Sequence, residues 1–290
     1  MNTKSILSVF AVSALLLTQC GGGDDTANVS TEDTNKVVTT VKDTLPPSTV
    51  DGFSQFKFDM LLANLPSPLE IINDLNASKA EYNESLVTDK KKASSVSDHN
   101  KQAFFMGAYT VDMSYLIDYD KGTDALGYMT SVKKLSDDLG ISKYYDKTFY
   151  DRFNGNLGKK DSLMNMVNSA ITLTDKFCRS NDNLKTSTYI FTGSWLEGLY
   201  MATQVIKDQP RTEQNKAIYA RVWQQRFHAK NLLDALETFK TDAGCKNLIP
   251  VIKDIQAICD KVQNETDLTQ AQVAQVGEKV AKLRELMFGK

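Results

Sequence analysis

The distribution of proline most constrains what this chain can fold into. Only six prolines occur in 290 residues, and four of them lie before residue 69. The other two, Pro210 and Pro250, fall between segments in which apolar residues recur at helical spacing. Because proline breaks helix interiors, a long stretch that nearly lacks it can be helical throughout. We therefore predict an all-α fold, a multi-helix bundle or short helical array of about eight antiparallel helices.

Apolar residues at intervals of three and four residues locate these helices. No convincing strand-like alternation of polar and apolar residues competes with this pattern. The predicted helices cover approximately residues 68–75, 98–119, 122–139, 161–177, 186–207, 212–240, 248–262 and 273–287.

The N-terminus has the pattern of a secretory signal. Lys4 precedes an apolar run, residues 6–17, that is too short to span a bilayer. The run ends in Leu-Thr-Gln-Cys20 followed by three glycines, which resembles the lipobox of bacterial lipoproteins. This resemblance implies cleavage before Cys20 and acylation of its thiol, with the signal peptide covering residues 1–19. The alternative is an ordinary signal peptide with an incidental cysteine.

The residues after Cys20 differ in composition from the rest of the chain. Residues 21–50 contain seven threonines, three glycines and five acidic residues against two lysines. Such a segment cannot bury enough apolar surface to fold by itself, so we interpret residues 20–50 as a flexible tether. Residues 51–290 then form the helical domain.

Composition argues against several functional classes. The formal net charge is −2, and no polybasic face appears, so we expect no nucleic-acid partner. The two histidines, His99 and His228, have no cysteine or second histidine at ligand spacing, which argues against a metal site. No glycine-rich phosphate loop and no nucleophile elbow occur. We therefore predict no metal and no cofactor.

Two similar aromatic stretches, residues 105–115 and 188–204, are expected at the centre of the domain. Each contains glycine beside large aromatic side chains, and small residues allow two helices to approach closely. In the first stretch, Asp112 falls on the predicted core face, where burial would raise the pKa of its carboxyl group. It is either hydrogen-bonded to nearby tyrosines such as Tyr109 and Tyr115, as a structural acid, or a proton-exchanging acid in a pocket.

The second stretch presents two different faces. Trp195 shares one helical face with Leu199, whereas Glu197 and Tyr200 share the opposite face with Gly193. The polar face is either the wall of a ligand groove or a second packing surface. The candidate ligand-binding residues are therefore Tyr109, Asp112, Tyr115, Trp195, Glu197 and Tyr200.

Three cysteines remain besides Cys20. An oxidising envelope would allow two of them to pair, and Cys245 with Cys259 would close the shortest loop. Three buried reduced thiols, including Cys178, are the alternative.

Several motifs together resemble a family of uncharacterised all-helical lipoproteins from Gram-negative bacteria. The resemblance spans approximately residues 66–206, and its most specific part is the Trp-x-Glu-Gly-Leu-Tyr element. It implies an all-helical fold and a lipid anchor in the cell envelope but no mechanism. The motifs are Gly107-Ala-Tyr109-x-x-Asp112-x-x-Tyr115, Lys134-Leu135-x-x-x-Leu139-Gly140-Ile141, Asp161-Ser162-Leu163 and Gly193-x-Trp195-Leu196-Glu197-Gly198-Leu199-Tyr200.

Two functional hypotheses follow from the sequence. The first is a non-catalytic helical scaffold that is tethered by acyl chains and binds a protein or another envelope component. Its expected location is the outer membrane. The second is a small-ligand binder or acid/base enzyme that uses an aromatic-lined pocket with Asp112 and Glu197. The two hypotheses differ in whether these side chains converge on an enclosed pocket.

Overall fold

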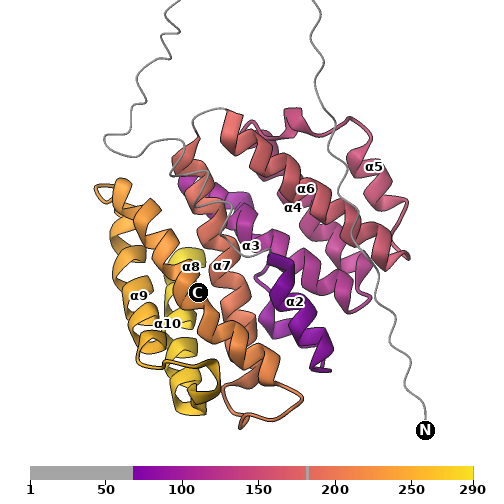
Figure 1. The fold of residues 1–290 in the computed structure, drawn as a ribbon. Coiled ribbons are helices and arrows are strands. Elements are labelled where there is room, and N and C mark those ends of the chain that lie inside the picture. The colour runs from indigo at the N-terminus through magenta and orange to yellow at the C-terminus, as the bar shows by residue number, and fades with distance from the viewer. Residues whose placement is uncertain (1–67, 181–182, 290) are drawn as a thin grey trace, which may run out of the picture. The chain divides into compact units, whose positions relative to one another are not determined.

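A computed structural model of the chain describes residues 68–180 and 183–289, all of which belong to one compact unit, residues 47–290. The predicted signal peptide, Cys20, the tether and the first part of the predicted domain lie outside these described residues. Within them there are nine α-helices and no strand, which confirms the all-α prediction (Figure 1).

The predicted helices all have counterparts in the structure, with two departures. The ninth helix, α5, is a six-residue turn that was not predicted. Short 3-10 helices occupy several connections: η1 (Glu84–Leu86), η2 (Lys92–Ser95), η3 (Ser142–Tyr144) and η4 (Glu265–Asp267). The α-helices are α2 (Pro68–Ala77), α3 (His99–Asp118), α4 (Gly122–Asp138), α5 (Phe149–Asn154), α6 (Lys160–Ser180), α7 (Leu184–Ile206), α8 (Lys216–Thr238), α9 (Ala243–Asp260) and α10 (Gln270–Phe288).

The second departure is at α9, which begins earlier than predicted and contains Pro250 in its interior. Its start is fixed by Asp242, whose side chain accepts a hydrogen bond from the backbone N–H of Gly244 at 3.0 Å. Gly244 therefore lies in the first turn of α9. The prediction that Pro250 separates two helical segments was wrong, because capping and burial of the apolar face outweigh the one lost backbone bond.

Helices α3 and α7 form the centre of the domain and share its most extensive helix–helix contact. Gly107 of α3 and Gly193 of α7 each face backbone of the other helix: a Cβ atom on Gly107 would collide with the carbonyl of Ile190 and lie 2.9 Å from the Ser194 nitrogen. The Ser194 hydroxyl donates to the Gly107 carbonyl at 3.0 Å. The glycines of the two aromatic stretches thus permit the close helix approach predicted from sequence.

The other helices lie on two sides of this central pair (Figure 1). Helices α4, α5 and α6 lie on one side, and α8, α9 and α10 on the other, while α2 packs against α3 and α7. Between α2 and α3, residues 79–98 contain only two short 3-10 helices. We call residues 79–98 the covering segment, because they lie over the buried polar cluster described next.

Candidate functional site

A buried ion pair between Glu197 of α7 and Arg284 of α10 forms the centre of the candidate site. The guanidinium donates from Nε to Oε2 and from Nη2 to Oε1, both at 2.8 Å. Glu197 is completely buried, and the Arg284 side chain is 17% exposed. This two-point geometry matches the planar fork of arginine to a carboxylate and is among the stronger hydrogen-bonded pairs in proteins.

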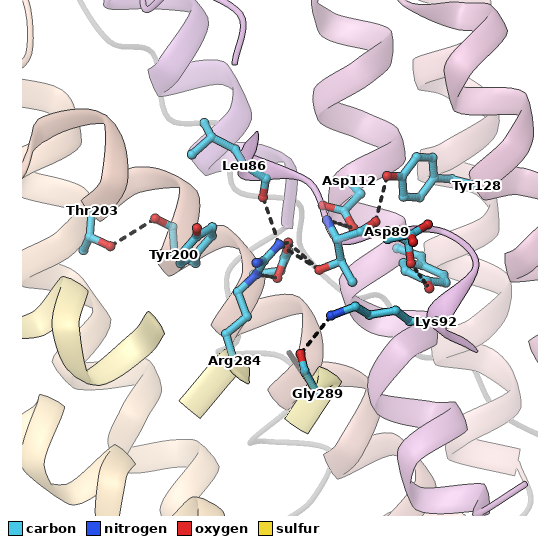
Figure 2. A network of polar contacts seen from close by, with 12 residues as sticks. Leu86, Asp89, Lys92, Asp112, Tyr128, Tyr200, Thr203, Arg284 and Gly289 are labelled. Carbon is cyan, nitrogen blue, oxygen red and sulfur yellow. Dashed lines mark hydrogen bonds and ion pairs between the residues drawn. The ribbon is translucent and has the colours of Figure 1, made fainter. Parts of the chain in front are cut away.

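Thr88 of the covering segment completes the ion pair, beside the hydrogen bond from Arg284 to Leu86 that Figure 2 shows. Its hydroxyl donates to Glu197 Oε1 at 3.1 Å and accepts from Arg284 Nη2 at 2.8 Å. Arg284 Nη2 also donates to the carbonyl of Leu86 at 3.1 Å. The covering segment therefore supplies two further acceptors for Nη2 of a largely buried cation, and such additional hydrogen bonds help a buried ion pair to be tolerated.

Asp112 of α3 adds a second buried carboxyl group to the cluster. Its Oδ2 accepts from the Thr88 backbone N–H at 3.2 Å, while Oδ1 has no donor partner among the described residues. Burial raises the pKa of Asp112 well above its ordinary value, and the charge of Glu197 and a hydrogen bond between the two carboxyl groups raise it further. Arg284 and the Thr88 N–H oppose this rise only in part. The neutral, protonated form of Asp112 is therefore favoured beside the ionised Glu197.

Four tyrosines direct their hydroxyls at the main chain of the covering segment rather than at a ligand. Burial raises the pKa of all four, so these hydroxyls stay protonated. Tyr109 donates to Asp89 O at 2.8 Å and accepts from Ala93 N at 3.1 Å; Tyr115 accepts from Asn83 N at 2.8 Å; Tyr119 donates to Ala80 O at 2.7 Å; and Tyr128 donates to Thr88 O at 2.7 Å.

The structure brings only some of the predicted site residues together. Asp112 and Glu197 meet at the centre, and the Tyr200 ring lies 4.1 Å from the Arg284 guanidinium carbon in a cation–π contact. Tyr109 and Tyr115 do not bond to Asp112, which corrects the expected Asp–Tyr hydrogen bond: the Thr88 N–H takes that place. Trp195 takes no part in the cluster, and its buried Nε1 has no hydrogen-bond partner among the described residues.

Thr88 and Arg284 are the members of the cluster that sequence reasoning missed. Thr88 hydrogen-bonds to Glu197, which lies 109 residues further along the chain, and it sits in a polar connection with no periodic pattern. Arg284 is the residue after Leu283, which belongs to the apolar stripe of α10. A charged residue bordering such a stripe was the one available signal that the end of the chain carries a buried partner.

The three cysteines of the described residues are free, buried thiols. A Cys245–Cys259 disulfide is incompatible with this fold, because both lie on the continuous helix α9. At 1.5 Å of rise per residue, their fourteen-residue separation places them about 21 Å apart, against about 6 Å between the Cα atoms of a disulfide. The structure thus matches the alternative of buried reduced thiols.

Two further absences concern the described residues alone. In residues 68–180 and 183–289, no three His, Cys, Asp or Glu side chains are grouped so that they could hold a metal ion. None of the helices there is both long and apolar enough to cross a bilayer.

Several cavities of the described residues lie outside the polar cluster, including an open one of about 420 Å³ bordered by residues 94–97, α3 and α4. An apolar cavity of about 30 Å³ lies between α3, α4, α6 and α7, and its lining includes Met106, Met113 and Met129. A polar cleft of about 570 Å³ lies between the start of the covering segment and the junction of α7 with α8. None of these three is lined by Asp112 or Glu197.

Comparisons with protein-family models, with curated proteins and with solved structures gave no match.

Proposed function

We propose that this protein is a lipid-anchored lipoprotein of the bacterial cell envelope and that its helical domain is a non-catalytic binding scaffold. The anchor follows from the short apolar N-terminal run and the lipobox-like sequence that ends in Cys20. Acyl chains on Cys20 would hold the protein at a membrane, which we take to be the outer membrane, and residues 20–50 would separate the domain from it.

One observation carries the non-catalytic part of the proposal: the protein's own chain occupies the place where its acidic and aromatic candidates converge. A general acid must come within hydrogen-bond reach of its substrate. Asp112 and Glu197 have no exposed surface, and Thr88 contacts both of them. The cluster therefore serves to join α3, α7, α10 and the covering segment.

The alternative is an acid/base enzyme that uses Asp112, and the raised pKa of that carboxyl group is what favours it. Access to Asp112 would require the covering segment to leave, which breaks the hydrogen bonds of Thr88 and of the tyrosines described above. The scaffold proposal requires no such rearrangement.

Metabolic labelling tests the anchor. Cells that express the full chain are grown with an alkyne analogue of palmitate, and wild type is compared with Cys20→Ser. We expect label on the wild-type protein and its recovery in outer-membrane fractions, with both lost in Cys20→Ser. Unlabelled wild-type protein released into the soluble fraction would instead indicate an ordinary signal peptide.

A further inference from the structure

The polar cleft has the dimensions of a ligand site. One wall is residues 78–83 together with Leu86, and the other comes from the end of α7, the following connection and the start of α8. Its volume of about 570 Å³ falls in the range of about 300–1,000 Å³ typical of small-molecule sites. The apolar cavity, at about 30 Å³, is much smaller than such sites.

The walls of the cleft are held in place by hydrogen bonds between them and within each. Gln214 donates from Nε2 to the carbonyl of Ser78 at 2.7 Å, which joins the two walls. Asn215 is 4% exposed; its Nδ2 donates to Pro210 O at 3.0 Å, and its Oδ1 accepts from Thr212 N at 2.7 Å. A site whose walls are fixed before binding loses less conformational entropy when a ligand arrives.

The cleft also presents carboxamide groups that are not used inside the protein. The Gln209 side chain, Gln204 Nε2, Asn83 Nδ2 and Gln214 Oε1 make no hydrogen bond to another described residue. A carboxamide offers both donors and an acceptor. A sugar hydroxyl likewise donates and accepts, so a set of unused carboxamides suits a ligand that is rich in hydroxyl groups.

The charge and the aromatic content of the cleft lining restrict the chemical class of the ligand further. Lys79 and Glu81 are the charged residues of the lining, and their opposite signs leave the cleft without net charge. Tyr82 contributes a half-buried ring that is stacked on Tyr115 with 5.7 Å between centroids and 23° between planes. A fixed ring with an apolar body and a polar tip packs against C–H groups while its hydroxyl remains available for hydrogen bonding.

From these features we infer that the cleft binds a short, neutral saccharide. The inference rests on the proposed binding role, for which it names a ligand class. The chemistry is shared by free short saccharides and by the chain of a polysaccharide, and the experiment below separates these sources.

Saturation-transfer NMR on the purified full chain tests the inference. The probes are cellobiose, maltose and N,N′-diacetylchitobiose, with glucuronic acid as the charged comparison. We expect transfer to at least one neutral disaccharide and weaker transfer to glucuronic acid. Binding of the six-sugar homologue more tightly than the disaccharide identifies a polysaccharide chain as the source, and equal affinity identifies a short free saccharide.

Two variants make the test specific to the cleft. Gln209→Ala removes a carboxamide that both donates and accepts, so we expect an affinity about tenfold lower, which corresponds to about 1.4 kcal/mol. Gln263→Ala removes an exposed glutamine outside the cleft and is expected to bind as wild type does. No transfer to any neutral disaccharide, or equal affinities for Gln209→Ala and wild type, would overturn the inference.

The result is independent of the anchor, because binding is measured on purified protein. Failure of acylation at Cys20 would refute the membrane attachment and leave the cleft untouched. Cleavage of a disaccharide in the NMR tube would refute the non-catalytic role while upholding the saccharide site.

Discussion

Replacing Asp112 with asparagine tests the protonation of the buried cluster most directly. The raised pKa means that Asp112 is protonated in the folded protein at pH values where it is ionised in the unfolded chain. Asparagine has the shape of a protonated aspartic acid: its oxygen can accept from the Thr88 N–H, and its amide nitrogen can donate to Glu197. The substitution therefore keeps the hydrogen bonds and removes the ionisable group.

The expected effect has a definite sign and slope. Between the unfolded pKa, about 3.9, and the higher folded pKa, the folded state binds a proton that the unfolded state has lost. The free energy of unfolding of the wild type therefore falls by about 1.4 kcal/mol per pH unit across this window because of Asp112. Asparagine does not titrate, so the variant shows no such loss. The free energy of unfolding of Asp112→Asn relative to the wild type therefore rises with pH and stops rising above the folded pKa of Asp112. For a domain of this size, each pH unit corresponds to about 3–6 °C in Tm.

Thermal melts of both proteins at pH 5 and pH 8 measure the effect. We expect a small advantage for Asp112→Asn at pH 5 and a larger one at pH 8. Asp208→Asn, which removes an exposed carboxylate outside the cluster, is the matched control and should show no comparable pH dependence. A marked loss of Tm in Asp112→Asn at both pH values would show that Asp112 is an ionised acceptor and refute this account.

Three further predictions follow. Glu197→Gln leaves the buried Arg284 charge without its partner, so we expect the free energy of unfolding, measured in urea, to fall by about 3–5 kcal/mol. An unchanged urea midpoint would mean that the ion pair contributes little to stability. Gly107→Ala forces α3 and α7 apart, and the overpacking cost of about 1–3 kcal/mol should exceed the gain of about 1 kcal/mol in helix propensity. Gly158→Ala, where the added Cβ meets open space, is the control. Equal stabilities of the two variants would indicate that α3 and α7 cross loosely. Cys245 and Cys259, whose pKa values burial raises (that of Cys259 to about 12), should resist iodoacetamide in the native protein and react after unfolding without reductant; a need for reductant would contradict free thiols.

The helices could be predicted because burial of one face repeats every three to four residues along the chain. Helix α6 shows this most clearly, with Leu163, Val167 and Ala170 all buried. Helix α5 escaped prediction because six residues, with Phe149 and Phe153 buried, are too few to establish a period. The start of α9 was missed because capping by Asp242 is a local side-chain interaction that the apolar pattern does not contain.

The candidate site was predictable only in part, for a similar reason. Periodicity placed Asp112 on the core face, and the structure shows that it is completely buried. The hydrogen-bond donor to this carboxyl group, the Thr88 N–H, comes from the covering segment, and a contact between segments that lack a common period leaves no mark in the sequence pattern. The tyrosines were recognised as important, but the sequence could not show that their hydroxyls bond to main-chain atoms.

Because the tyrosines bond to main-chain atoms of the covering segment, the position of this segment depends little on its own side chains. Tyr115, Tyr119 and Tyr128 bond to amide and carbonyl groups that every residue type except proline provides. The exposed residues of the segment can therefore change identity while the path of the chain stays the same, whereas Thr88, whose hydroxyl is used, and the buried Leu86 and Ala93 cannot. The shape and charge of this surface can thus change by substitution alone while the helical framework beneath it stays the same.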